Sequence, residues 1–144
     1  MSPVELLPIP PVESATEPIF STADLLQRWR ALMGPLGFGE RLLRCVFVGP
    51  DRRFTKILLD MPVPNTADPD VLASLLPALS AILDEREPGT TVAFLLTRPG
   101  RGRVSNADRE WATIVTAGAE RFEVPIEPFF RANDESLVLV EPVT

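Results

Sequence analysis

Histidine is absent from this 144-residue sequence, and cysteine occurs only once. Without an imidazole there is no Ser–His–Asp triad, and the most common general base of enzymes is missing. The single cysteine, Cys45, excludes an internal disulfide and every metal site that needs several thiolates. Cys45 stands in an apolar run, which favours a buried, inert thiol over a nucleophile. We therefore expect no catalytic residue, no bound metal and no cofactor.

Long apolar runs are also missing. No uncharged run approaches the roughly 20 residues of a membrane helix, and the proline-broken N-terminus lacks the basic start of a secretory signal. These features predict a cytoplasmic protein that does not bind membranes. The basic residues are 13 arginines and Lys56, and the net charge is −6. This charge disfavours broad binding to nucleic acid, because like charges repel.

Residues 1–20 differ from the rest of the chain in composition. Five prolines between Pro3 and Pro18 predict an extended, polyproline-like N-terminal arm. One interpretation is a disordered leader. The other is a docking arm, because the segment is unusually apolar for a free tail, with Val4, Leu6, Leu7, Ile9 and Val12. Residues 21–144 are predicted to form a single domain.

The remaining sequence alternates helix and strand signals. Capping boxes at Ser21-x-x-Asp24 and Ser105-x-x-Asp108 predict the starts of the first and last helices, and Asp68 predicts a cap for the middle one. Pro77 lies inside the middle helix and is expected to kink or split it. Strands are predicted over residues 41–48, 54–61, 91–96, 124–130 and 136–140. The expected fold is α/β, a mixed sheet flanked by helices in the order α-β-β-α-β-α-β-β.

One stretch of this pattern resembles a known family. The segment Leu96-Thr97-Arg98-Pro99-Gly100, followed by the Ser105-x-x-Asp108 helix start and by Phe122–Ile126, is similar to the end of a RadC-type JAB/MPN domain. That family has a His-x-His-Pro-Ser-Gly turn before a Ser-x-x-Asp helix. The resemblance covers roughly residues 40–140 and implies a JAB/MPN-like fold.

In active members of that family, two histidines and the aspartate hold a zinc ion that activates water. The resemblance matches these positions to Leu96, Arg98 and Asp108. Leucine offers no lone pair, and the permanent positive charge of arginine repels zinc. The resemblance therefore implies a degenerate form without a metal, in which Ser105 and Asp108 serve only as a helix cap. Glu40 is the nearest acidic residue to the family's upstream glutamate, but it matches no motif.

Arginines crowd the start of the last predicted helix. Backbone N–H groups and the helix dipole favour an anion there, so we consider a phosphate or carboxylate site built from Arg98, Arg101, Arg103 and Arg109. The alternative is a solvated loop whose charges balance nearby acids.

The preferred functional hypothesis is a non-catalytic JAB/MPN-like domain acting in protein–protein interaction or scaffolding, with a protein partner or a second copy. One alternative is an anion or nucleotide sensor that binds a phosphate-bearing ligand through the arginine-rich loop. The other is a DNA-associated accessory factor, which the acidic net charge disfavours.

Overall fold

The computed structural model describes residues 8–143, apart from the side chain of Lys56. Five strands form one mixed sheet in the order β2-β1-β3-β4-β5. The pairs β2–β1, β1–β3 and β4–β5 are antiparallel, and β3–β4 is parallel. The strands are β1 (Leu42–Val48), β2 (Phe54–Pro62), β3 (Thr91–Thr97), β4 (Phe130–Ala132) and β5 (Leu137–Leu139).

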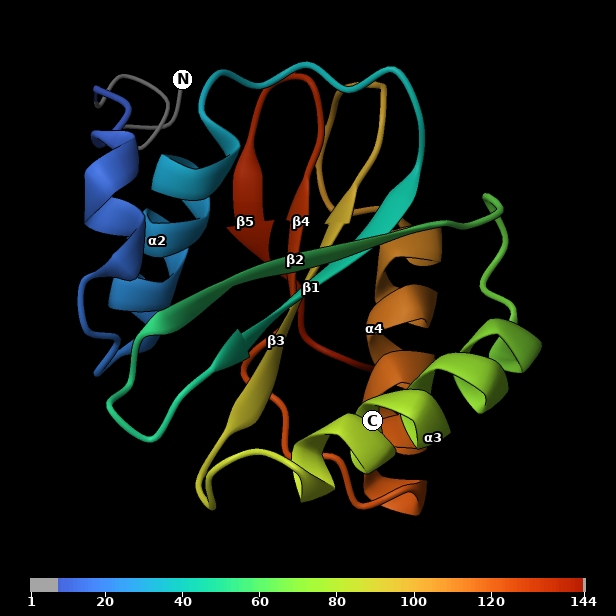
Figure 1. Cartoon of the computed structure of the whole chain (residues 1–144). Helices are drawn as coiled ribbons and strands as arrows, with labels where there is room; N and C mark the ends of the chain where they lie inside the picture. The colour runs from blue at the N-terminus through green and yellow to red at the C-terminus, as the bar shows by residue number, and fades with distance from the viewer. Residues whose placement is uncertain (1–7, 144) are drawn as a thin grey trace.

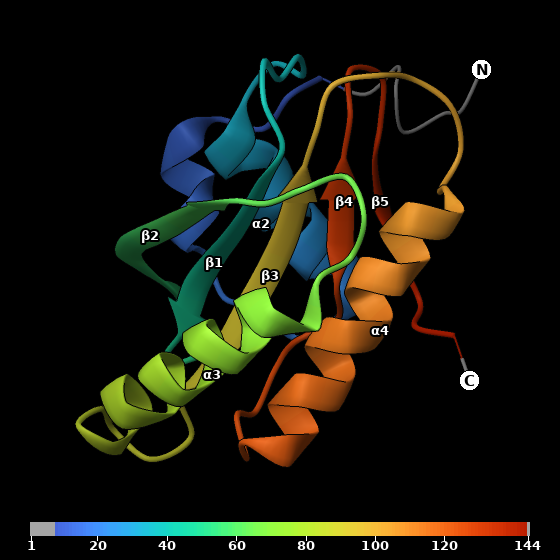
Figure 2. The ribbon, with the colours of Figure 1, turned by 90° about the vertical axis from the view of Figure 1, so that its right-hand side faces the viewer.

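Helices cover both faces of this sheet. Helix α2 (Thr22–Met33) lies on one face, and α3 (Pro69–Asp84) and α4 (Asn106–Arg121) lie on the other (Figures 1 and 2). The expected class, α/β with a mixed sheet flanked by helices, is confirmed. Alternate residues of β1 and β3 point to opposite faces, so each face has a core of its own. Trp29 of α2 anchors one core and Trp111 of α4 anchors the other.

The helices begin at the predicted caps. The hydroxyls of Ser21 and Ser105 accept the backbone N–H of Asp24 and Asp108, and the Asp68 carboxylate accepts that of Asp70. The second half of the first capping box differs from the prediction, because Asp24 accepts the N–H of Phe20, one residue before the cap. Side-chain caps of this kind explain why the helix starts are readable in the sequence.

Helix α3 is not split at Pro77, although the sequence suggested a kink or a break. Pro77 lacks the N–H that would reach the carbonyl of Ala73, and both residues lie on the exposed face of the helix. Water can therefore hydrate that carbonyl. The buried face, with Leu72, Leu76 and Leu79, continues through the proline and packs on the core.

Two other expectations need correction. Val12–Thr16 form a short 3-10 helix, η1, rather than an extended arm, and Ala15 and Ile19 are buried. Residues 1–7 lie outside the described residues, and the domain boundary at residue 20 stays a prediction. The strand predicted over residues 124–130 is reduced to one bridge at Ile126, with β4 following at Phe130–Ala132. Pro125 and Pro128 have no N–H to donate to a neighbouring strand, which explains why the strand begins only at Phe130.

None of the helices in the described part of the chain is long and apolar enough to cross a membrane.

Candidate functional site

Two loops meet at one edge of the sheet. The loop after β3 runs from Arg98 to the start of α4, and the turn after β4 contains Asn133, Asp134 and Glu135. Because β3 and β4 are parallel neighbours, their carboxyl ends lie at the same edge, and the loops that follow them lie together. The predicted arginine loop therefore lies against an acidic turn that follows it by 33 to 34 residues in the sequence.

The centre of this region is the carboxylate of Asp108, which has no exposed surface. Arg98 donates to both of its oxygens, with Nε–Oδ1 and Nη2–Oδ2 distances of 2.7 and 2.9 Å. Arg131 donates from Nε to Oδ2 at 3.2 Å, and the backbone N–H of Ser105 donates to the same oxygen at 2.9 Å. We call Arg98, Asp108 and Arg131 the ion-pair cluster. The Asp108 carboxylate accepts four hydrogen bonds in all, one at Oδ1 and three at Oδ2.

Positively charged groups outnumber the buried carboxylate in and around this cluster. Burial alone would raise the pKa of Asp108. The hydrogen bonds from Arg98 and Ser105 lower this pKa by more than burial raises it, so the carboxyl pKa lies below its ordinary value of 3.8. The Asp108 hydrogen bond raises the pKa of Arg98, while burial lowers that of Arg131. Burial and the charge of Arg98 also lower the pKa of Arg41. One carboxylate therefore faces three guanidinium groups, which repel a metal cation.

The acidic turn holds the arginine loop by its backbone. The Asp134 carboxylate accepts the N–H of Gly100 at 2.8 Å and that of Phe38 at 3.2 Å, and these bonds lower the Asp134 pKa. Glu135 accepts the N–H of Gly102 at 2.7 Å. Gly100 and Gly102 have φ values of 103° and 99°, which glycine adopts without strain. The loop is thus fixed at both glycines.

The arginines proposed for anion binding do not line a common pocket. Arg98 is held by Asp108, and Arg101 reaches Glu135 at 3.4 Å from a side chain that is 76% exposed. Arg109 is exposed on the first turn of α4. Only Arg103 of the four lines the main groove described below. The Ser105–Asp108 capping box is present as predicted, with both of its hydrogen bonds.

Sequence reasoning missed the partners of this loop. The run Asn133-Asp134-Glu135 beside the last strand was a usable signal, because acids near a turn often bind backbone N–H groups. Arg131 gave no signal, since arginine is seldom fully buried. Of the other residues considered, Cys45 is buried in β1, which raises its pKa to about 12, and Glu40 is exposed near Arg44.

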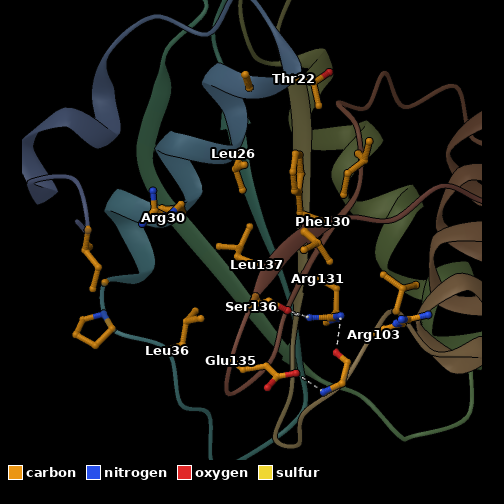
Figure 3. A pocket seen from close by; sticks show the side chains of 18 residues that line it. Thr22, Leu26, Arg30, Leu36, Arg103, Phe130, Arg131, Glu135, Ser136 and Leu137 are labelled. Carbon is orange, nitrogen blue, oxygen red and sulfur yellow. Dashed lines mark hydrogen bonds between the residues drawn. The ribbon is translucent and has the colours of Figure 1, made fainter. Parts of the chain in front are cut away.

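A groove of about 810 Å³ lies beside this region, between α2 and β5 (Figure 3). Leu26 and Arg30 of α2 face Phe130 and Leu137 across it, and Leu36 lies at one end. The backbone of Gly102 and the side chains of Arg103, Arg131 and Glu135 form the side nearest the ion-pair cluster. Its size is in the range of ligand sites, which usually span about 300–1,000 Å³.

Comparison with known proteins adds no family to this description. No protein-family model matches the sequence, and no curated protein is similar to it. Residues 8–143 contain no group of three or more histidine, cysteine, aspartate or glutamate side chains that could hold a metal ion.

Proposed function

We propose that this chain is a non-catalytic, JAB/MPN-like domain of the RadC type that acts in protein–protein interaction. In this proposal the ion-pair cluster replaces the metal centre of the active family. The observation that carries it is the state of Asp108, the one retained ligand position. Its two oxygens receive four hydrogen bonds from Arg98, Arg131 and Ser105.

The residues at the other two matched positions support a structural role. Leu96 and Arg98 are two positions apart at the end of β3, so their side chains share the face that α4 covers. Leu96 has no exposed surface and packs in the same core as Trp111. A leucine and a cation do not fit a zinc ion, so the proposed function includes no hydrolytic step. The cluster instead ties β3, β4 and the start of α4 together.

The alternative of an anion sensor on the arginine loop has weaker support. Arg98 is committed to Asp108, and the two backbone N–H groups of Gly100 and Gly102 are committed to carboxylates. The first turn of α4 is likewise capped by its own side chains. Three of the donors that made this loop attractive for a phosphate are therefore already bound within the chain, whereas Arg103 and Arg109 are exposed.

Rebuilding the ligand set tests the resemblance directly. In the triple variant Leu96→His/Arg98→His/Arg131→Met, which also removes the buried guanidinium bound to Asp108, two imidazoles would join Asp108, and we expect one zinc ion per chain with a rise in melting temperature. If histidine in the core unfolds the apo variant, zinc should restore the fold, because metal binding is coupled to folding. The matched control adds Asp108→Asn and should lose the zinc. A folded triple variant that binds no zinc would reject the proposed correspondence.

A further inference from the structure

Three arginines lie on neighbouring strands where β3 ends. Leu43 of β1 pairs with Leu96 of β3. The same register, continued by two residues, places Arg41 opposite Arg98, and Leu96 also pairs with Arg131 of β4. Side chains two residues apart on a strand share a face, so all three arginines lie on the face that α4 covers. The loops before β1 and after β3 and β4 meet at this end of the sheet (Figure 1).

Arg41 differs from the other two arginines because its guanidinium group has no partner in the described part of the chain. Arg98 and Arg131 both donate to Asp108. Arg41 makes no hydrogen bond or ion pair within residues 8–143. Its side chain is partly exposed, but the Nη1 atom is buried and lacks an acceptor. A buried donor without an acceptor is costly, and a bound ion or water molecule is one of the few explanations for such a group in a folded protein.

Positive charge exceeds negative charge around Arg41. Burial and the nearby charge of Arg98 lower the pKa of Arg41, because both disfavour its charged form. The carboxylate of Asp108, which lies nearby, is already hydrogen-bonded to the other two arginines. The acids of the neighbouring turn, Asp134 and Glu135, accept backbone N–H groups of the arginine loop, and neither forms an ion pair with Arg41. An anion beside Arg41 would therefore meet an uncompensated positive charge.

The donors that remain at this position suit an oxyanion. A guanidinium group has five N–H donors. Arg98 uses Nε and Nη2 for Asp108 and Nη1 for the carbonyl of Pro99, and each of its two Nη atoms carries a second N–H. Gly100 leaves space beside this group, because a Cβ at that position would lie only 3.3 Å from Nη1 of Arg98. Phosphate-like anions accept several guanidinium N–H groups at once, in geometries that match the planar fork of arginine.

We infer that Arg41 and Arg98 together bind a small oxyanion of the phosphate class, which reaches them from the exposed side of Arg41. The anion supplies the acceptor that Arg41 lacks and reduces the repulsion between the two guanidinium groups. This site differs from the anion site considered from the sequence, because Arg41 precedes β1 and the three exposed arginines of the earlier set take no part. The inference goes beyond the proposed interaction function, since it makes the stability of the fold depend on a bound anion.

Thermal unfolding of the full chain, in sodium phosphate and in sodium chloride of equal ionic strength, tests this inference. About 20 mM phosphate should raise the melting temperature by about 5 °C, as expected for a dissociation constant of about 1 mM. Arg41→Met keeps the apolar part of the side chain but removes its charge. In chloride this variant should melt at the wild-type temperature or above it, because the lost cation had no partner, and phosphate should no longer stabilise it. A variant that is less stable in both buffers and keeps the full phosphate effect would show that Arg41 is only structural.

The matched control is Arg103→Met, which removes the same charge from an exposed arginine that lines the groove beside α2. This variant should keep the full phosphate effect. If Arg103→Met and Arg41→Met lose the effect equally, phosphate acts through non-specific attraction and the assignment to Arg41 is wrong.

Isothermal titration calorimetry of inorganic phosphate into the wild-type chain makes the test independent of how any variant folds. We expect one phosphate per chain, and sulfate should compete for the same site because it is also a tetrahedral dianion. No heat of binding and no rise in melting temperature would overturn the inference. The zinc experiment measures a metal ion in a different variant, so the two proposals can fail separately. Zinc binding without phosphate binding would reject only the anion site, and the reverse result would reject only the proposed correspondence.

Discussion

The two ends of β3 each carry an arginine–carboxylate cluster, but water reaches them to different degrees. At the carboxyl end, Asp108 and Arg131 have fully buried side chains. At the amino end, Glu127 accepts two hydrogen bonds from Arg52, with Nη2–Oε1 and Nη1–Oε2 distances of 2.7 and 3.0 Å, and a third from Thr91. The Arg52 side chain there is 32% exposed.

This difference in burial determines how much stability is lost when one partner of each cluster is removed. Where both charges are buried, removing one leaves the other without water or a partner. The resulting loss of stability is much larger than the stability that the intact pair contributes. Where the arginine is partly exposed, water compensates for much of the loss. The amino-end pair mainly connects segments, since Arg52 also donates to the carbonyl of Ile19 and thereby fixes the strand turn to the N-terminal segment.

The largest expected effect is from Asp108→Asn. The substitution keeps the size of the side chain but removes the buried carboxylate to which both Arg98 and Arg131 donate, and we expect a loss of about 3–5 kcal/mol in the free energy of unfolding. Urea unfolding followed by circular dichroism measures it. Asp51→Asn, at an exposed carboxylate 4.0 Å from Arg53, is the matched control and should have almost no effect. Equal losses in the two variants would remove the distinction between buried and exposed clusters.

Acid should weaken both clusters. The pKa values of Asp108 and Glu127 lie below their ordinary values of 3.8 and 4.5 because arginine hydrogen bonds favour the charged forms over the opposing effect of burial. A carboxyl with a lowered pKa stabilises the fold above its unfolded pKa, and this contribution is lost as the pH falls through the folded value. Urea midpoints should therefore fall steeply below about pH 4.5. Asp108→Asn should make that fall shallower.

A smaller effect is expected from Glu127→Gln at the amino end. One charged hydrogen-bond network is lost, but Arg52 can turn toward water, so we expect about 1–2 kcal/mol. Limited proteolysis supplies a second measurement, because release of Arg52 should also loosen its bond to Ile19 and expose residues 8–20 to cleavage. A loss as large as that of Asp108→Asn would show that exposure does not govern the cost.

The smallest expected effect is from Ser105→Ala. The Ser105 hydroxyl accepts the N–H of Asp108 at 3.1 Å, and its loss should cost about 1 kcal/mol, as for other helix N-caps. Thermal unfolding measures the change. Ser105→Thr retains a capping hydroxyl and serves as the control, with most of the stability kept. A loss of several kcal/mol in Ser105→Ala would mean that the serine acts through the ion-pair cluster and not only as a cap.

The sequence predicted the framework of this fold because its signals are local. Ser21, Asp68 and Ser105 cap helices within three residues of themselves, and the alternation of β1 and β3 follows from the chain alone. The N-terminal segment was misjudged because proline content predicts an extended chain. It gives no indication that Ile19 finds an apolar site near Arg52.

The site was predicted only in part for a similar reason. The capping box of Ser105 and Asp108 is local and was recognised, whereas the partners of the arginine loop come from the turn after β4. A count of arginines could not reveal that Arg98 is neutralised by Asp108 or that Arg131 is buried beside it. Arg98 and Arg101 do pair with nearby acids, while anion binding by Arg98, Arg101, Arg103 and Arg109 stays a prediction.

A double-mutant cycle between Arg98 and Asp108 tests most directly whether the cluster is a coupled structural unit. Urea unfolding would be measured for Arg98→Met, Asp108→Asn and the double variant. We expect the double variant to lose about 2 kcal/mol less than the two single losses added together, because both single changes remove the same two hydrogen bonds between Arg98 and Asp108. Losses that simply add would contradict this expectation, since the two side chains would then stabilise the fold independently.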